Sequence, residues 1–190
     1  MNQFLIILRG VPASGKTTIA KQFRNFDKKI AWLKVDNFKE FFAEDSSVAL
    51  DYVNGSAIAT LEYLFDQGFS VIMDGVFQET SAIDEALELA GGKNIKAIVY
   101  QIKCSLSILQ ERDRTRPGVK EGHRKPLGDD VIARIYQKLE TTFYPNAEII
   151  NTEQLSLQEC IEKISEDMKE YELVTLREKR NRKSAKIKLC

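Results

Sequence analysis

Cysteine is scarce in this sequence, and no part of it is apolar over a long stretch. The three cysteines, Cys104, Cys160 and Cys190, are scattered, and none of them forms a CxxC pair. Such a set argues against a disulfide framework or a zinc site and fits a reducing cytoplasm. No apolar run approaches the roughly 20 residues that span a bilayer, and no signal peptide is recognisable. We therefore expect a cytoplasmic protein without membrane contact.

The chain also lacks an excess of charge of either sign. Its 28 basic and 28 acidic residues balance, so the total charge does not point to a polyanionic partner. Segment 177–188 is the exception, with seven Lys or Arg residues against the single acid Glu178. A solvated chain end is the ordinary interpretation of such a run, and contact with nucleic acid is the alternative. We assign 1–173 as one domain and 174–190 as a basic tail.

Short apolar segments alternate with longer amphipathic segments along the first 170 residues. The pattern predicts strands near 4–8, 30–35, 70–74, 95–102 and 147–150. It predicts helices near 15–26, 47–67, 80–90, 105–115, 128–143 and 156–170. Four of the five strands are almost wholly apolar, which is typical of strands covered on both faces. The alternation predicts an α/β fold with a parallel sheet between two layers of helices.

Residues 10–17 match the phosphate-loop motif GxxxxGK[ST] and lie between the first predicted strand and the first predicted helix. Glycines let the backbone curl so that its N–H groups point at phosphate oxygens, and the following helix adds its positive end. Lys16 is predicted to contact the β- and γ-phosphates, and the Thr17 hydroxyl to bind magnesium. We assign to ATP binding Gly10, Val11, Pro12, Ala13, Ser14, Gly15, Lys16, Thr17 and Thr18.

Carboxylates follow the second and third predicted strands. In an open parallel sheet, ligands bind outside the carboxyl ends of the strands. Asp36 follows the second strand, where it can orient and deprotonate a substrate hydroxyl; its alternative role is to cap a helix beginning at Asn37. Asp74 and Gly75 follow the third strand in the pattern of a Walker B segment, whose carboxylate holds magnesium.

Two arginines precede a segment rich in glycine, proline and basic residues. Arg112 and Arg116 are four residues apart, so they share one face of the predicted helix. Segment 116–128 is interpreted as a lid over an anionic ligand, with a plain surface loop as the alternative. The arginines can stack on a base and neutralise charge on the transferring phosphoryl group. Alternatively, they belong to a helix end where Glu111 and Asp113 pair locally.

Together these features resemble the small P-loop kinases, a group that includes adenylate, shikimate and gluconate kinases, chloramphenicol phosphotransferase, zeta toxins and the polynucleotide kinase domain. The resemblance covers about residues 1–170 and is best to the zeta-toxin-like and chloramphenicol-phosphotransferase-like AAA-type kinases. It implies an adenylate-kinase-like three-layer fold with a five-stranded parallel sheet in the order 2-3-1-4-5 and a lid. It also implies ATP and Mg²⁺ as cofactors, and a catalytic set of Lys16, Asp36, Arg112 and Arg116.

Departures from the motifs of this group limit which chemical class the phosphate acceptor can belong to. Gln78 stands where adenylate kinases have a phosphate-binding arginine, and Asp36 has no clear counterpart in them, which favours a neutral hydroxyl over a nucleoside monophosphate. Polynucleotide kinases carry an arginine shortly after their aspartate, whereas this chain has Asn37, Phe38 and Lys39.

We therefore predict an ATP-dependent kinase that phosphorylates a hydroxyl group of a small-molecule acceptor. The alternatives are a polynucleotide 5′-hydroxyl kinase, with the basic tail on nucleic acid, and an ATPase or switch without an acceptor. The acceptor pocket is expected within 37–60, where aromatic residues form either its walls or part of the core: Phe38, Phe41, Phe42 and Tyr52. A monomer and a homodimer both fit the sequence.

Overall fold

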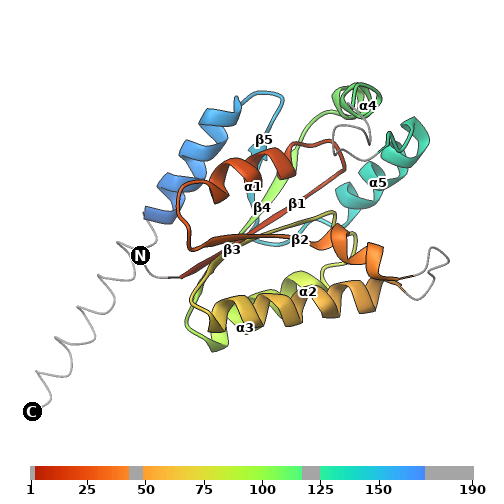
Figure 1. Cartoon of the computed structure of the whole chain (residues 1–190). Coiled ribbons are helices and arrows are strands. Elements are labelled where there is room, and N and C mark those ends of the chain that lie inside the picture. Colours follow the sequence, from red (N-terminus) through yellow and green to blue (C-terminus); the bar gives the residue numbers. More distant parts are fainter. Residues whose placement is uncertain (1–2, 43–48, 117–124, 170–190) are drawn as a thin grey trace, which may run out of the picture.

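Five parallel strands form one sheet in the order β2-β3-β1-β4-β5 (Figure 1). The strands are β1 (Phe4–Gly10), β2 (Ile30–Lys34), β3 (Ser70–Gly75), β4 (Lys96–Lys103) and β5 (Glu148–Asn151). Each lies within about two residues of a predicted strand. This arrangement confirms the predicted α/β fold and its strand order.

The computed structural model describes residues 3–42, 49–116 and 125–169. Of the predicted lid, 116–128, only Arg116 and residues 125–128 fall within these ranges. The predicted basic tail, 174–190, lies outside the described residues. Within the three ranges, no helix combines the length and apolar character that crossing a membrane requires.

Helices cover both faces of the sheet (Figure 1). One face packs against α1 (Lys16–Arg24) and a helix at 157–169, and the other packs against α2 (Ala49–Asp66) and α3 (Ser81–Gly92). Two further helices, α4 (Leu106–Arg114) and α5 (Asp129–Thr141), pack together beyond the carboxyl end of β4. The two-sided cover explains why the strands are apolar.

Side-chain alternation along the central strand divides the core between the two layers. Leu5 and Ile7 of β1 pack with α2 and α3, whereas Ile6 and Leu8 pack with α1 and the helix at 157–169. All four are at most 1% exposed. Burying an aliphatic side chain of this size contributes about 1.5–3 kcal/mol, so these contacts hold β1 and the loop that follows it in place.

A short 3₁₀ helix, η1 (Val35–Phe41), follows β2 directly. The alternative role considered for Asp36 was the cap of a helix beginning at Asn37. In the structure Lys34 is the N-cap, and Asp36 lies inside the first turn of η1. Because all five strands are parallel, this turn lies at the same sheet edge as residues 10–15 and the carboxyl end of β3.

Candidate active site

The phosphate loop curves tightly between β1 and α1. Ala13 and Gly15 have φ angles of 69° and 97°, in the left-handed region, and the Ser14 N–H donates to the Val11 carbonyl at 3.2 Å. A Cβ at Gly10 would lie 2.6 Å from the Ile102 carbonyl oxygen, so only glycine fits beside β4 there. The helix begins immediately behind the loop, which directs its N-terminal N–H groups into the curve.

Lys16 lies inside this curve. Its Nζ donates to the carbonyl oxygens of Gly10 and Val11, both at 2.8 Å, and to the Ser14 Oγ at 3.2 Å. Burial lowers the pKa of Lys16 to about 8, although the charges of Asp74 and Asp36 act in the opposite direction. The loop therefore holds a positive charge that Asp74 and Asp36 stabilise only in part, as an anion-binding site requires.

Thr17 and Asp74 meet at the carboxyl end of β3. The Thr17 Oγ1 donates to the Asp74 Oδ2 at 2.9 Å, and the Asp74 side chain is buried. Burial raises the pKa of Asp74, while Lys16 and the hydrogen bond from Thr17 lower it. A hydroxyl and a carboxylate beside a phosphate loop are the hard oxygen donors that Mg²⁺ prefers, so these residues fit the ion. When bound, Mg²⁺ would neutralise charge on the phosphates.

Replacing Asp74 by asparagine is expected to raise the Mg²⁺ concentration needed for half-maximal ATP turnover by about tenfold or more, because one anionic ligand is lost. A Mg²⁺ titration of turnover at saturating ATP measures this. Asp84→Asn, on α3, is the matched control. An unchanged Mg²⁺ dependence in Asp74→Asn would remove this residue from the metal site.

Asp36 lies in the first turn of η1, with its side chain 22% exposed. Its Oδ1 accepts from the Lys39 Nζ at 2.6 Å, one 3₁₀ turn further along. The charge of Asp36 also raises the pKa of Lys16, so the carboxylate lies within electrostatic reach of the phosphate loop. Asp36 is thus a partly exposed carboxylate, paired with Lys39, within electrostatic reach of the phosphate loop.

Arg112 is connected to the phosphate loop through a residue that the sequence did not point out. Its Nη1 donates to the Thr152 Oγ1 at 3.0 Å and its Nη2 to the Thr152 carbonyl at 2.8 Å. The Thr152 Oγ1 in turn donates to the Ser14 carbonyl at 2.9 Å. The only sequence signal for Thr152 is that a polar residue follows the last strand, at the functional edge of the sheet.

A cavity of about 260 Å³ opens beside this connection. It combines loop backbone, one guanidinium group and aliphatic side chains, and its lining includes Ala13, Gly15, Thr18, Arg112, Thr152, Leu155 and Leu157. A planar heterocycle attached to a phosphate chain in the loop would meet both a cationic and an apolar wall here.

Arg116 lies two residues beyond the end of α4, so it does not share a helix face with Arg112 as the spacing predicted, and it pairs with a carboxylate of that helix. Its Nε lies 3.2 Å from the Asp113 Oδ1, and its side chain is 19% exposed. The alternative considered for this helix, local pairing by Asp113, is therefore present in the structure. The charge of Arg116 nevertheless lowers the pKa of Lys16, so it also reaches the phosphate loop electrostatically.

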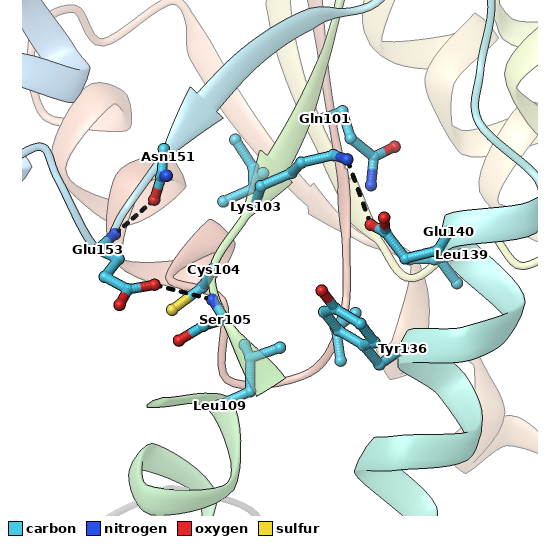
Figure 2. Close-up of a pocket in the computed structure, with 12 residues that line it drawn as sticks. Gln101, Lys103, Cys104, Ser105, Leu109, Tyr136, Leu139, Glu140, Asn151 and Glu153 are labelled. Atoms are coloured by element: carbon cyan, nitrogen blue, oxygen red, sulfur yellow. Dashed lines mark hydrogen bonds and ion pairs between the residues drawn. The ribbon is translucent and has the colours of Figure 1, made fainter. Parts of the chain in front are cut away.

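A second cavity, of about 250 Å³, lies among β4, β5, α4 and α5 (Figure 2). Lys103 pairs with Glu140 across it at 3.2 Å, and Glu153 accepts from the Ser105 N–H at 3.0 Å. Val11 of the phosphate loop also lines it. The sequence did not predict this cavity, because its walls come from four separate elements.

The aromatic residues expected near the acceptor divide into two kinds. Phe38 and Phe42 pack against the core beside α2, whereas Phe41 and Tyr52 are 76% and 61% exposed. The rings meet in pairs, with centroids 5.6 Å apart for Phe38 and Phe41 and 6.0 Å apart for Phe42 and Tyr52. The core alternative therefore applies to Phe38 and Phe42, while a role of Phe41 and Tyr52 in an acceptor pocket stays a prediction.

Residues 5–142 match a family model described as an AAA domain. An L-seryl-tRNA(Sec) kinase from Methanococcus maripaludis is 26% identical over 175 residues, which is 85% of this chain. The chain spans 65% of that relative's length, just under two thirds.

Solved structures share the fold at low identity. A gluconokinase from Sinorhizobium meliloti superposes with a TM-score of 0.59 at 18% identity, covering 84% of this chain and 87% of its own. The APS kinase from Mycobacterium tuberculosis, solved with AMPPNP and APS, gives a TM-score of 0.63 at 13% identity. That match covers 88% of this chain and 98% of the enzyme.

Proposed function

Because the chain belongs to the AAA domain family of P-loop kinases, we propose that it is an ATP-dependent kinase transferring the γ-phosphate to a hydroxyl group of a small-molecule acceptor. The observation that carries this proposal is the position of Asp36. Its carboxylate is partly exposed, pairs with Lys39 and acts electrostatically on Lys16, so a hydroxyl held against it would face the triphosphate.

Each site residue has a distinct role in this proposal. Residues 10–18 bind the phosphates of ATP, and Lys16 supplies a positive charge to the β- and γ-phosphates. Thr17 and Asp74 hold Mg²⁺. Asp36 orients the acceptor hydroxyl and takes its proton.

The two arginines act on the other side of the nucleotide. Arg112 packs against the base in the cavity beside Thr152, and Arg116 neutralises charge on the transferring phosphoryl group. Excluding water from this site distinguishes a kinase from an ATPase that uses the same loop.

Nucleotide affinity is expected to fall as the pH rises above about 8. The folded protein releases the Lys16 proton near pH 8, whereas bound phosphates raise the pKa of Lys16 again, so binding takes up a proton in this range. The dissociation constant of Mg–AMPPNP should therefore rise by up to about tenfold per pH unit. Calorimetric titrations from about pH 7 to pH 10 measure this slope.

The same shift acts on stability with a defined sign. Because burial places the pKa of Lys16 below its ordinary value of 10.5, the unfolded chain binds more protons between about pH 8 and 10.5, and the free protein gains stability as the pH rises through this window. Lys16→Met should remove both pH dependences. A dissociation constant that stays constant above pH 8 in the natural protein would contradict this account of Lys16.

A second candidate acceptor is a hydroxyl group carried on RNA. It is favoured by the 26% identity to a protein named as an L-seryl-tRNA(Sec) kinase. Because this chain spans 65% of that protein's length, part of the relative has no counterpart in it. A hydroxyl on RNA would need the same carboxylate at Asp36, so the two candidates differ in acceptor and share their chemistry.

A transfer screen decides between the candidates. The protein is incubated with Mg²⁺ and ATP labelled in the γ-phosphate, together with sugars, nucleosides, antibiotics or 5′-hydroxyl RNA. Label in a small molecule supports the first candidate, and label in RNA supports the second. Release of label only as inorganic phosphate, unaffected by any acceptor, would overturn both.

A further inference from the structure

Asp113, near the end of α4, has a fully buried side chain. Its Oδ2 accepts the backbone N–H groups of Leu127 and Gly128, at 2.7 and 3.0 Å. Its Oδ1 lies 3.2 Å from the Nε of Arg116. One carboxylate therefore binds the end of α4 to the start of α5.

Burial of a carboxylate is costly unless donors surround it. Two backbone N–H groups donate to its Oδ2, and the Arg116 guanidinium group forms an ion pair with its Oδ1, an oxygen that accepts no hydrogen bond within the described residues. A second pair joins the same two helices, Arg114 Nε with Asp129 Oδ1 at 3.3 Å, but these side chains are 62% and 48% exposed. An exposed pair of this kind contributes about 0–1 kcal/mol, so it cannot orient the helices as Asp113 does.

The carboxylate also determines where Arg116 points. The ion pair is made on the Nε side of the guanidinium group, and the two terminal nitrogens are the donors of the fork that suits a phosphate. The charge of Arg116 lowers the pKa of Lys16, so the guanidinium group lies within electrostatic reach of the phosphate loop. Arg112, within α4, connects that helix to the loop through Thr152.

We infer that Asp113 is a positioning residue: it fixes the guanidinium of Arg116 and the backbone of Leu127 and Gly128 so that Arg116 meets the phosphates of a bound nucleoside triphosphate. This inference rests on the proposed role of Arg116. It assigns to the buried aspartate an effect on nucleotide binding that passes entirely through that arginine.

A double-mutant cycle tests the inference. Asp113→Asn keeps the size of the side chain, but an amide has one acceptor oxygen and therefore cannot serve both the backbone N–H groups and the guanidinium. Asp113→Asn and Arg116→Ala are each expected to weaken Mg–AMPPNP binding about tenfold, and the double variant no more than the weaker-binding single variant. Calorimetry measures the dissociation constants, and thermal unfolding confirms that each variant is folded. Asp129→Asn, in the exposed pair, is the control and should bind within about twofold of the natural protein.

Three results would overturn the inference. They are unchanged binding in Asp113→Asn, unchanged binding in Arg116→Ala, or a loss of affinity in the double variant equal to the product of the two single losses. If Asp113→Asn does not fold, Arg116→Lys replaces it, because lysine keeps the charge without the fork. A large loss with lysine supports positioning, and binding equal to that of the natural protein contradicts it. Because AMPPNP binding needs no acceptor, failure of the proposed kinase activity would appear separately, in the transfer screen.

Discussion

Replacing Lys16 by methionine is expected to reduce phosphoryl transfer by about 100-fold or more, with nucleotide binding weakened as well. The Nζ of Lys16 is the buried cation at the centre of the phosphate loop, within 2.8 Å of two loop carbonyls. Methionine has a similar length but no charge, so the loop would lose its attraction for the β- and γ-phosphates. Initial rates and Mg–AMPPNP dissociation constants measure the two losses.

A matched control for this variant lies on the same helix. Lys21 is exposed, with its Nζ 5.8 Å from the centroid of the Trp32 ring, so Lys21→Met should keep normal rates. Because Lys16→Met also removes a charge whose burial is costly, its thermal unfolding temperature should not fall by more than a few degrees. Normal transfer by a folded Lys16→Met protein would mean that the loop does not bind the donor.

Replacing Asp36 by asparagine is expected to lower transfer by about 100- to 10,000-fold while changing Mg–AMPPNP affinity by less than about threefold. Asparagine keeps the shape of the side chain and its place in η1, but it cannot take the proton from the hydroxyl group of the acceptor. The predicted separation of rate from affinity is the sign of a residue that acts on the acceptor and not on the nucleotide.

The control for Asp36→Asn is Asp27→Asn. The Asp27 Oδ1 accepts the exposed Lys29 N–H at 2.8 Å in the turn before β2, a hydrogen bond that asparagine can also accept. Asp27→Asn should therefore keep the normal rate. If Asp36→Asn transfers phosphate as fast as the natural protein, the acceptor is activated elsewhere and the proposed role of Asp36 is wrong.

The fold and the phosphate loop were predictable from the sequence because their signals are local. Apolar runs such as 4–8 mark strands covered on both faces, and the loop motif fills eight consecutive positions. Asp36 and Asp74 were also located at the functional edge, since each lies at the carboxyl end of a strand and parallel strands end together. Pairing of Thr17 with Asp74 follows from the same arrangement.

Contacts between distant residues were not predictable in this way. Thr152 joins Arg112 to Ser14 across separations of 40 and 138 residues, and no local pattern marks it. The double role of Asp113 depends on α5 returning to α4. These contacts arise from packing between elements, which hydrophobic periodicity does not determine.

Arg9 is the clearest case of a residue that the sequence could not explain. It lies on the otherwise apolar strand β1 and is fully buried. Its guanidinium donates to the carbonyl of Phe77 at 3.0 Å, to Gln101 at 2.6 Å and to Thr142 at 2.9 Å. Hydrogen bonds to three separate elements offset the cost of burying the charge, and only the folded chain brings them together.

The central claim is that this chain is a kinase directed at a hydroxyl group. Its most direct test is to measure whether the γ-phosphate is transferred to an acceptor or released as inorganic phosphate. With labelled ATP, Mg²⁺ and the acceptor found in the screen, the natural protein should place most of the label on that acceptor and little in inorganic phosphate. Asp36→Asn should bind the nucleotide and label neither. Hydrolysis at the same rate with and without acceptor, unaffected by Asp36→Asn, would contradict the account.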